Sequence, residues 1–222
     1  MLTKRVAIIL LLTLLPWPAV WYGMYEIRSI VWTFFLYHVI CLLPAIIIGH
    51  GLWKDHLALP TRRQIAILLA SAIGISTIGT LIYNFTGSLV VDREEVLETM
   101  TARGYQATWI LPLSFYFIFI NATLEELFWR GVVLNELDHL NKHVRHAGTV
   151  WTAVAFGAWH WLVFRVLVRP GWAEISVLAL MGVGLGASWL YRKTNSLVLP
   201  ILWHAFVVDL AAIVVFVALQ DH

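Results

Sequence analysis

The sequence has little charge and almost no cysteine, and both shortages restrict what the protein can be. Only 13% of its 222 residues are charged, 60% are hydrophobic and the mean hydropathy is +0.80. A soluble domain needs a more polar surface, so this composition predicts an integral membrane protein. The single cysteine, Cys41, excludes a disulfide framework and a cysteine-based metal site. The net charge of +2 is too small to indicate a nucleic-acid partner.

Long polar stretches are also missing, which leaves no room for a separate soluble domain. Seven apolar segments are long enough to cross a hydrocarbon core of about 30 Å. They cover residues 6–24, 30–53, 64–91, 107–134, 148–168, 174–191 and 197–219. We therefore predict an all-α bundle of about seven transmembrane spans that forms one integral membrane domain over residues 1–222.

Basic residues in the short loops predict the orientation of the chain. With a cytoplasmic N-terminus, the inner loops hold nine Lys and Arg residues and the outer loops hold five, which favours that orientation. The inner set is Lys4, Arg5, Lys54, Arg62, Arg63, Lys142, Arg145, Arg192 and Lys193, and the outer set is Arg28, Arg93, Arg103, Arg165 and Arg169. We therefore expect the C-terminus outside.

The polar stretch at residues 92–100 predicts a short helix that lies on the outer interface. Val96, Leu97 and Met100 would form its apolar side. A solvated loop is the alternative.

Ionisable side chains inside a span cost about 2.5–3.5 kcal/mol each on insertion scales, so each needs a partner or a purpose. The fourth segment carries Asn121, Glu125, Glu126 and Arg130, the fifth carries His160, and the seventh carries His204 and Asp209. Glu126 and Arg130 are four residues apart, so they should pair on one helix face. Glu125 then points about 100° away. Asn121, one turn earlier, is placed to hydrogen-bond to Glu125.

Helical rise places Glu125, His160 and His204 at similar depths. At about 1.5 Å per residue they lie roughly 14, 18 and 10 Å from the inner ends of their segments. We therefore expect one site assembled from three helices. The other histidines lie near loops or lack such company, so we expect them to be ordinary: His38, His50, His56, His139, His143, His146 and His222.

Three ordered motifs resemble those of the CPBP (CAAX protease and bacteriocin-processing) family, which includes the Ras-converting CAAX endopeptidases. They are Glu125-Glu126-x-x-x-Arg130, Phe156-x-x-x-His160, and His204 in the last span after Asn195-Ser196-Leu197-Val198-Leu199-Pro200. The resemblance covers about residues 107–215, which we take as the catalytic core. It implies a glutamate-type intramembrane endopeptidase without an obligatory metal or other cofactor.

The third motif departs from the family pattern. The family usually has Asn, and sometimes Asp, four residues after the histidine, whereas this chain has Val208 there and Asp209 at the fifth position. On a regular helix Asp209 would point about 140° away from His204. Either a local bulge realigns Asp209, or the oxyanion role falls elsewhere.

The resemblance and the residue chemistry together predict a role for each side chain. Glu125 would take a proton from water that His160 orients, and His204 would hydrogen-bond to the oxyanion. Glu126 and Arg130 would fix the helix that presents Glu125. The expected partners are the lipid bilayer and a membrane-anchored protein or peptide substrate. The expected location is a multi-pass position in a bacterial inner membrane.

Four alternatives stay open on the sequence. Glu125, His160 and His204 also suit a catalytic zinc ion, although no HExxH pair is present. A non-catalytic bacteriocin-immunity or scaffold protein fits too, as does a transporter that uses Glu125 and Asp209 as a proton relay. Haem held between His160 and His204 would show a Soret band.

Overall fold

The computed structural model describes residues 2–140 and 145–220, so Lys142, His143 and His222 lie outside the described residues. The chain is 86% helical, and the described part contains no strand. Seven helices of the described part are long and apolar enough to cross a membrane. They run Lys4–Glu26, Ile30–Ile48, Arg62–Val90, Ala107–Leu140, His146–Leu167, Trp172–Thr194 and Val198–Ala218. The predicted all-α, multi-pass fold is therefore confirmed.

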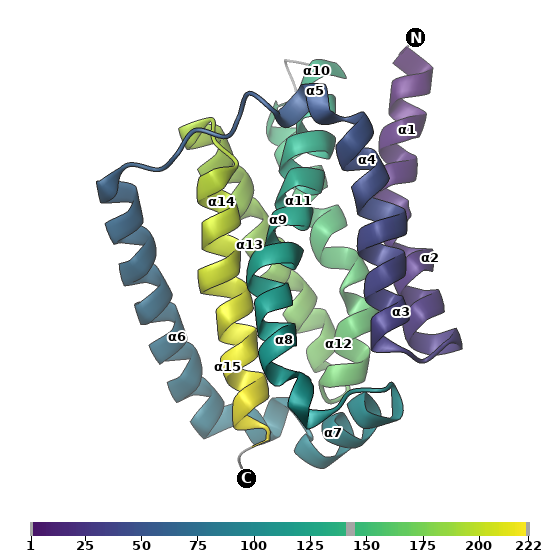
Figure 1. Cartoon of the computed structure of the whole chain (residues 1–222), viewed down its shortest axis with the longest axis vertical. Helices are drawn as coiled ribbons and strands as arrows, with labels where there is room; N and C mark the ends of the chain where they lie inside the picture. The colour runs from purple at the N-terminus through teal and green to yellow at the C-terminus, as the bar shows by residue number, and fades with distance from the viewer. Residues whose placement is uncertain (1, 141–144, 221–222) are drawn as a thin grey trace.

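Most spans consist of more than one helical segment. In chain order the α-helices are α1 (Leu2–Leu14), α2 (Pro16–Trp21), α3 (Ile30–Phe34), α4 (Leu43–Ile48), α5 (His50–Trp53), α6 (Arg62–Val90), α7 (Arg93–Ala102), α8 (Ile110–Phe115), α9 (Ala122–Glu126), α10 (Asn135–Leu140), α11 (Arg145–Trp159), α12 (Trp161–Leu167), α13 (Trp172–Thr194), α14 (Val198–Trp203) and α15 (Leu210–Ala218). The beginning of α1 and the end of α15 lie at opposite ends of the bundle (Figure 1), as an odd number of crossings requires. Which end faces the cytoplasm stays a prediction.

The stretch after the third span is a helix, α7, rather than a loop. Asp92 caps it by accepting a hydrogen bond from the Glu95 backbone N–H at 3.3 Å. Val96 is buried, while Glu94 and Glu95 are exposed. α7 lies at the same end of the bundle as the C-terminal end of α15 (Figure 1).

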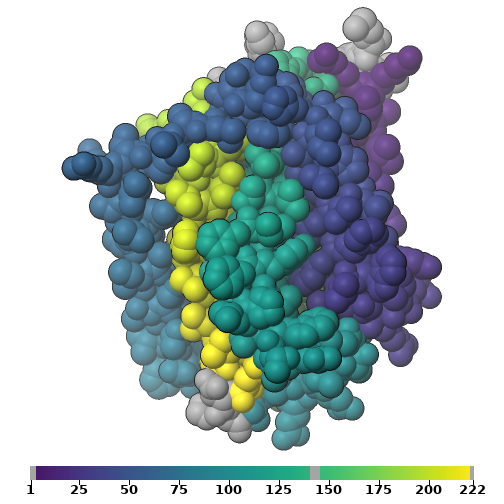
Figure 2. Space-filling view, in the orientation of Figure 1, coloured from purple at the N-terminus to yellow at the C-terminus, as the bar shows by residue number. Residues whose placement is uncertain are grey.

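The helix α6 stands at the edge of the bundle (Figure 2). It begins with a capping box between Thr61 and Gln64. Leu68 and Ala72 pack against Val207 of the last span. Other apolar side chains of α6 face away from the protein, and Phe85 is 83% exposed. Such a surface suits hydrocarbon rather than water.

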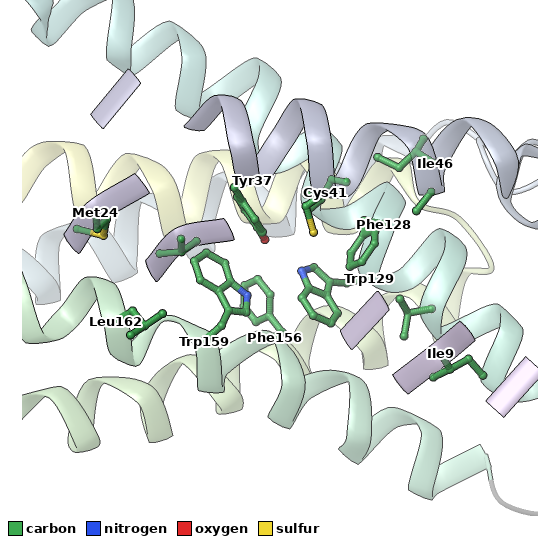
Figure 3. Close-up of a cluster of buried hydrophobic side chains, with 14 residues drawn as sticks. Ile9, Met24, Tyr37, Cys41, Ile46, Phe128, Trp129, Phe156, Trp159 and Leu162 are labelled. Carbon is green, nitrogen blue, oxygen red and sulfur yellow. The ribbon is translucent and has the colours of Figure 1, made fainter. Parts of the chain in front are cut away.

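A buried apolar cluster fixes the second, fourth and fifth spans around the site. Tyr37, Trp129, Phe156 and Trp159 converge in it from those three spans (Figure 3). The Tyr37 and Trp159 ring centroids are 4.4 Å apart. Because a close-packed interior deforms little, this cluster holds the polar residues beside it in place.

Several spans contain π-helical segments, each of which adds a residue to a turn. They are η1 (Tyr22–Glu26), η2 (Phe35–Leu42), η4 (Tyr116–Asn121), η5 (Leu127–Leu134) and η7 (His204–Asp209). Such segments occur frequently at functional sites, because the extra residue rotates every later side chain. Four of the five, η2, η4, η5 and η7, contain residues of the cluster described next.

Candidate active site

The buried Glu126 carboxylate of the fourth span contacts a histidine of the last span. Arg130, 0% exposed, donates from Nη1 to Glu126 Oε1 at 2.8 Å, so the pair expected from the four-residue spacing is present. Its Nη2 donates to the Gly184 carbonyl at 2.8 Å. His204 Nδ1 lies 2.8 Å from the same Glu126 oxygen. Since a carboxylate can only accept, Nδ1 is the donor and Nε2 points elsewhere.

The two oxygens of the neighbouring carboxyl group, Glu125, have different contacts. Oε1 accepts a hydrogen bond from the Tyr37 hydroxyl at 2.7 Å. Oε2 lies 3.5 Å from His204 Nε2. Glu125 is 2% exposed, yet it lines an internal cavity. One oxygen is therefore held in place, and the other is turned toward His204.

Asp209 lies beside His204 because η7 carries the extra residue of a π-helical turn. Hydrogen bonds in such a turn join residues five apart, so the fifth residue returns to nearly the same face. His204 Nε2 is 3.5 Å from Asp209 Oδ1. Of the two sequence alternatives, the structure has the local bulge. Val208 also lines the cavity.

Asn121 does not take the hydrogen bond that we expected. Its Oδ1 lies 3.0 Å from His38 Nε2, and its Nδ2 donates to Asp209 Oδ2 at 3.2 Å. Glu125 takes its hydrogen bond from Tyr37 instead. The reason is that the second span packs against this turn of the fourth span and supplies a hydroxyl to one residue and an imidazole to the other.

His38 is therefore not an ordinary histidine, which corrects the sequence prediction. It is 1% exposed, and its Nδ1 lies 2.6 Å from the Tyr116 hydroxyl. Tyr37 and His38 are consecutive polar side chains inside an apolar span. Because a polar side chain inside a span needs a partner or a purpose, the same reasoning applied to the sequence would have marked Tyr37 and His38 as candidate site residues.

His160 sits at a break in the fifth span, between α11 and α12. Its backbone N–H bonds to the Gly157 carbonyl at 3.2 Å, a tight turn that ends α11. Its Nδ1 donates to the Phe156 carbonyl at 2.8 Å, and its ring stacks on Trp159 at 3.6 Å between centroids. In the neutral ring Nε2 is then an acceptor. His160 and Glu125 line the same cavity, and the described residues show no direct hydrogen bond between them.

The cavity that joins these residues has a volume of about 320 Å³ and mainly apolar walls. Glu125, His160, His204 and Asp209 line one part of it. Met100 and Arg103 line the part beside α7. Because α7 lies at the end of the bundle where α15 ends (Figure 1), the cavity extends from the carboxylates toward that end.

The structure does not group a metal ligand set. Within residues 2–140 and 145–220, no three His, Cys, Asp or Glu side chains lie together in a way that could hold a metal ion. His204 Nδ1 is already engaged by Glu126. The zinc alternative thus has no ligand set among Glu125, His160 and His204 as they are placed here.

Comparison with known proteins agrees with the three motifs. Residues 107–208 match the family model described as type II CAAX prenyl endopeptidase Rce1-like. This segment is Rce1-like. It contains Glu125, Glu126, Arg130, His160 and His204. No curated protein and no solved structure matches the chain.

The Rce1-like segment does not contain the whole polar cluster. It ends at Val208, one residue before Asp209. It also excludes the second span with Tyr37 and His38. The Glu125 hydrogen bond from Tyr37 therefore comes from outside the family-matched part of the chain.

Proposed function

We propose that this protein is an intramembrane endopeptidase that hydrolyses a peptide bond of a membrane-associated protein or peptide with water activated by Glu125 and His160. The Rce1-like segment supports an endopeptidase at the level of the family. One observation carries the assignment of residues: the buried Glu125 carboxylate, oriented by Tyr37, shares a cavity with His160 and His204.

The contacts of the site support a proposed role for each side chain in this reaction. Tyr37 holds Glu125 Oε1, so Oε2 is the oxygen that takes a proton from water. His160 Nε2 accepts the second hydrogen bond of that water and orients it. With Nδ1 engaged by Glu126, a doubly protonated His204 donates from Nε2 to the oxyanion. A preorganised donor of this kind lowers the barrier by about 2.7–4 kcal/mol.

The proposed steps balance without a metal or another reactant. The water oxygen bonds to the scissile carbonyl carbon while its proton passes to Glu125. The tetrahedral intermediate then collapses, the carbon–nitrogen bond breaks, and Glu125 returns the proton to the leaving amine. The products are a carboxylic acid and an amine, which become a carboxylate and an ammonium group when the acid passes its remaining proton to the amine, and Glu125 is again ionised.

The proposal also covers the organisation and place of the protein. One integral domain would extend over residues 1–222, with a catalytic core at 107–215. The site lies within the bundle of candidate spans, which supports a membrane-anchored protein or peptide as the substrate. The location proposed is a bacterial inner membrane.

Cleavage in detergent should survive exhaustive removal of metal ions. Purified protein would be dialysed against a strong chelator and assayed with quenched fluorescent peptides, before and after zinc is added back. We expect equal rates, because Glu125 and His160 suffice to activate water. Activity that disappears on chelation and returns with zinc would make this a zinc peptidase.

Natural substrates would be sought by comparing the membrane proteome of cells that carry the wild-type protein with that of cells that carry Glu125→Gln.

Substitution at the bulged turn should reduce turnover. His204→Ala should lower kcat about 100- to 1000-fold, as the loss of one oxyanion donor typically does. Asp209→Asn removes the carboxylate whose oxygen lies 3.5 Å from His204 Nε2, so the imidazolium loses a facing charge and kcat should fall roughly 10-fold. Val208→Ala, which changes a neighbouring cavity residue without a polar contact, is the control. Wild-type turnover in Asp209→Asn would show that this acid has no part in the reaction.

A further inference from the structure

Arg103 lines the cavity from outside the membrane spans and outside the Rce1-like segment. It follows α7, where its Nη1 donates to the Thr99 carbonyl at 3.0 Å and its Nε to the Met24 carbonyl at 3.3 Å. These two bonds hold the guanidinium in place. Both acceptors are neutral, so neither balances its charge.

No carboxylate of the described residues pairs with this guanidinium. The arginines in described ion pairs are Arg5, Arg130, Arg169 and Arg192. Instead, burial and the neighbouring Arg28 charge lower the pKa of Arg103. A partly desolvated cation beside another cation and an apolar cavity is unfavourable until an anion joins it.

Arg103 is within reach of a peptide bound at Glu125. The Ile30 backbone N–H donates to the Arg103 carbonyl at 3.1 Å, which places Arg103 level with Ile30. Glu125 is bonded to Tyr37, seven residues further along the second span. At a helical rise of about 1.5 Å per residue, the positions of Ile30 and Tyr37 along the second span, and so of Arg103 and Glu125 beside them, are roughly 10 Å apart. A few residues of extended chain, at about 3.3 Å each, cover that distance.

We propose that Arg103, with Arg28 beside it, binds a carboxylate of the peptide substrate, while apolar residues of the peptide fill the cavity between Arg103 and Glu125. The carboxylate is either the C-terminal group or an Asp or Glu side chain. Nη2 has no partner among the described residues, so the planar guanidinium keeps a donor for the ligand. The interaction is remote from the reacting bond, so it should act on substrate binding rather than on kcat.

Because this inference rests on the proposed function, binding and cleavage have to be measured separately. Labelled apolar peptides would be titrated into the Glu125→Gln protein in a neutral detergent. Each peptide with a free C-terminal carboxylate would be compared with the same peptide carrying a C-terminal amide. In a second series, peptides with Glu at one position after the scissile bond would be compared with peptides that have Gln at that position. We expect one acidic form to bind about 10- to 100-fold more tightly than its neutral partner, which identifies the source of the carboxylate. Adding Arg103→Gln should abolish that difference.

Three controls keep the result interpretable. Arg169→Gln removes a charge at the same end of the bundle, but Arg169 is exposed and paired with Asp92, so the preference should persist. Arg28→Gln leaves the bonds of Arg103 to Met24 and Thr99 intact and should weaken the preference even if Arg103→Gln misfolds. Arg103→Glu should bind the corresponding Lys peptide better than the Glu peptide.

Two outcomes would overturn the proposal, and a third concerns only the function. Equal affinity for acidic and neutral peptides would refute the carboxylate site. So would an Arg103 effect that follows the anionic lipid content of nanodiscs instead of the peptide. If wild-type protein binds the acidic peptide through Arg103 but never cleaves it, the endopeptidase assignment fails while the binding site stands.

Discussion

Glu125→Gln should abolish peptide cleavage and leave the folded protein nearly as stable as the wild type. Glutamine keeps the size of the side chain, and its carbonyl still accepts the hydrogen bond from Tyr37. It cannot take a proton from water, and general-base catalysis typically contributes about 100- to 10,000-fold. We expect kcat to fall by at least about 1000-fold. Turnover of a genuine substrate and the thermal unfolding midpoint would be measured on the same preparation.

The matched controls separate the base from its surroundings. His160→Ala should lose as much activity as Glu125→Gln, since the water is then no longer oriented. Tyr37→Phe removes only the hydroxyl that holds Oε1, so it should retain partial activity. Full activity in Glu125→Gln would show that the proposed mechanism is wrong.

Glu126→Gln should lower both stability and activity, unlike the change at its neighbour. It leaves the guanidinium of Arg130 buried without its carboxylate, and breaking such a pair typically costs about 3–5 kcal/mol. It also removes the charged acceptor that orients His204. We expect a clear drop in the unfolding midpoint together with a reduced kcat.

A double variant distinguishes these two consequences. Replacing the pair by apolar residues, as in Glu126→Leu with Arg130→Met, removes the buried guanidinium together with its carboxylate and should recover most of the stability. Activity should stay low, because His204 has still lost the carboxylate that fixes its ring. If turnover returns along with stability, Glu126 serves only to neutralise Arg130.

Helix packing in this protein brings together residues that no motif connects. Tyr37 and His38 belong to a span outside the Rce1-like segment, yet Tyr37 contacts Glu125 and His38 contacts Asn121. The expected hydrogen bond from Asn121 to Glu125 was wrong for this reason. A partner one turn away is available only if a neighbouring span does not supply a better one.

The sequence by itself determined the membrane class, the seven spans and the pairing of Glu126 with Arg130. Those features depend on local quantities: the length of an apolar run against the thickness of a bilayer, and the four-residue period of a helix. The common depth of the motifs also follows from helical rise, and His204 does lie beside Glu125 and Glu126. For these features, each span can be treated as an independent cylinder.

Only the tertiary structure decided where the side chains of Asp209, Asn121 and Arg103 lie and what they contact. Asp209 faces His204 because η7 adds one residue to a turn, and spacing along a regular helix cannot show this. Asn121 and Glu125 take their partners from the second span, and Arg103 reaches the cavity from a linker. Rotation of a helix about its axis and contacts between distant segments depend on the packing of the whole bundle, which no local pattern encodes.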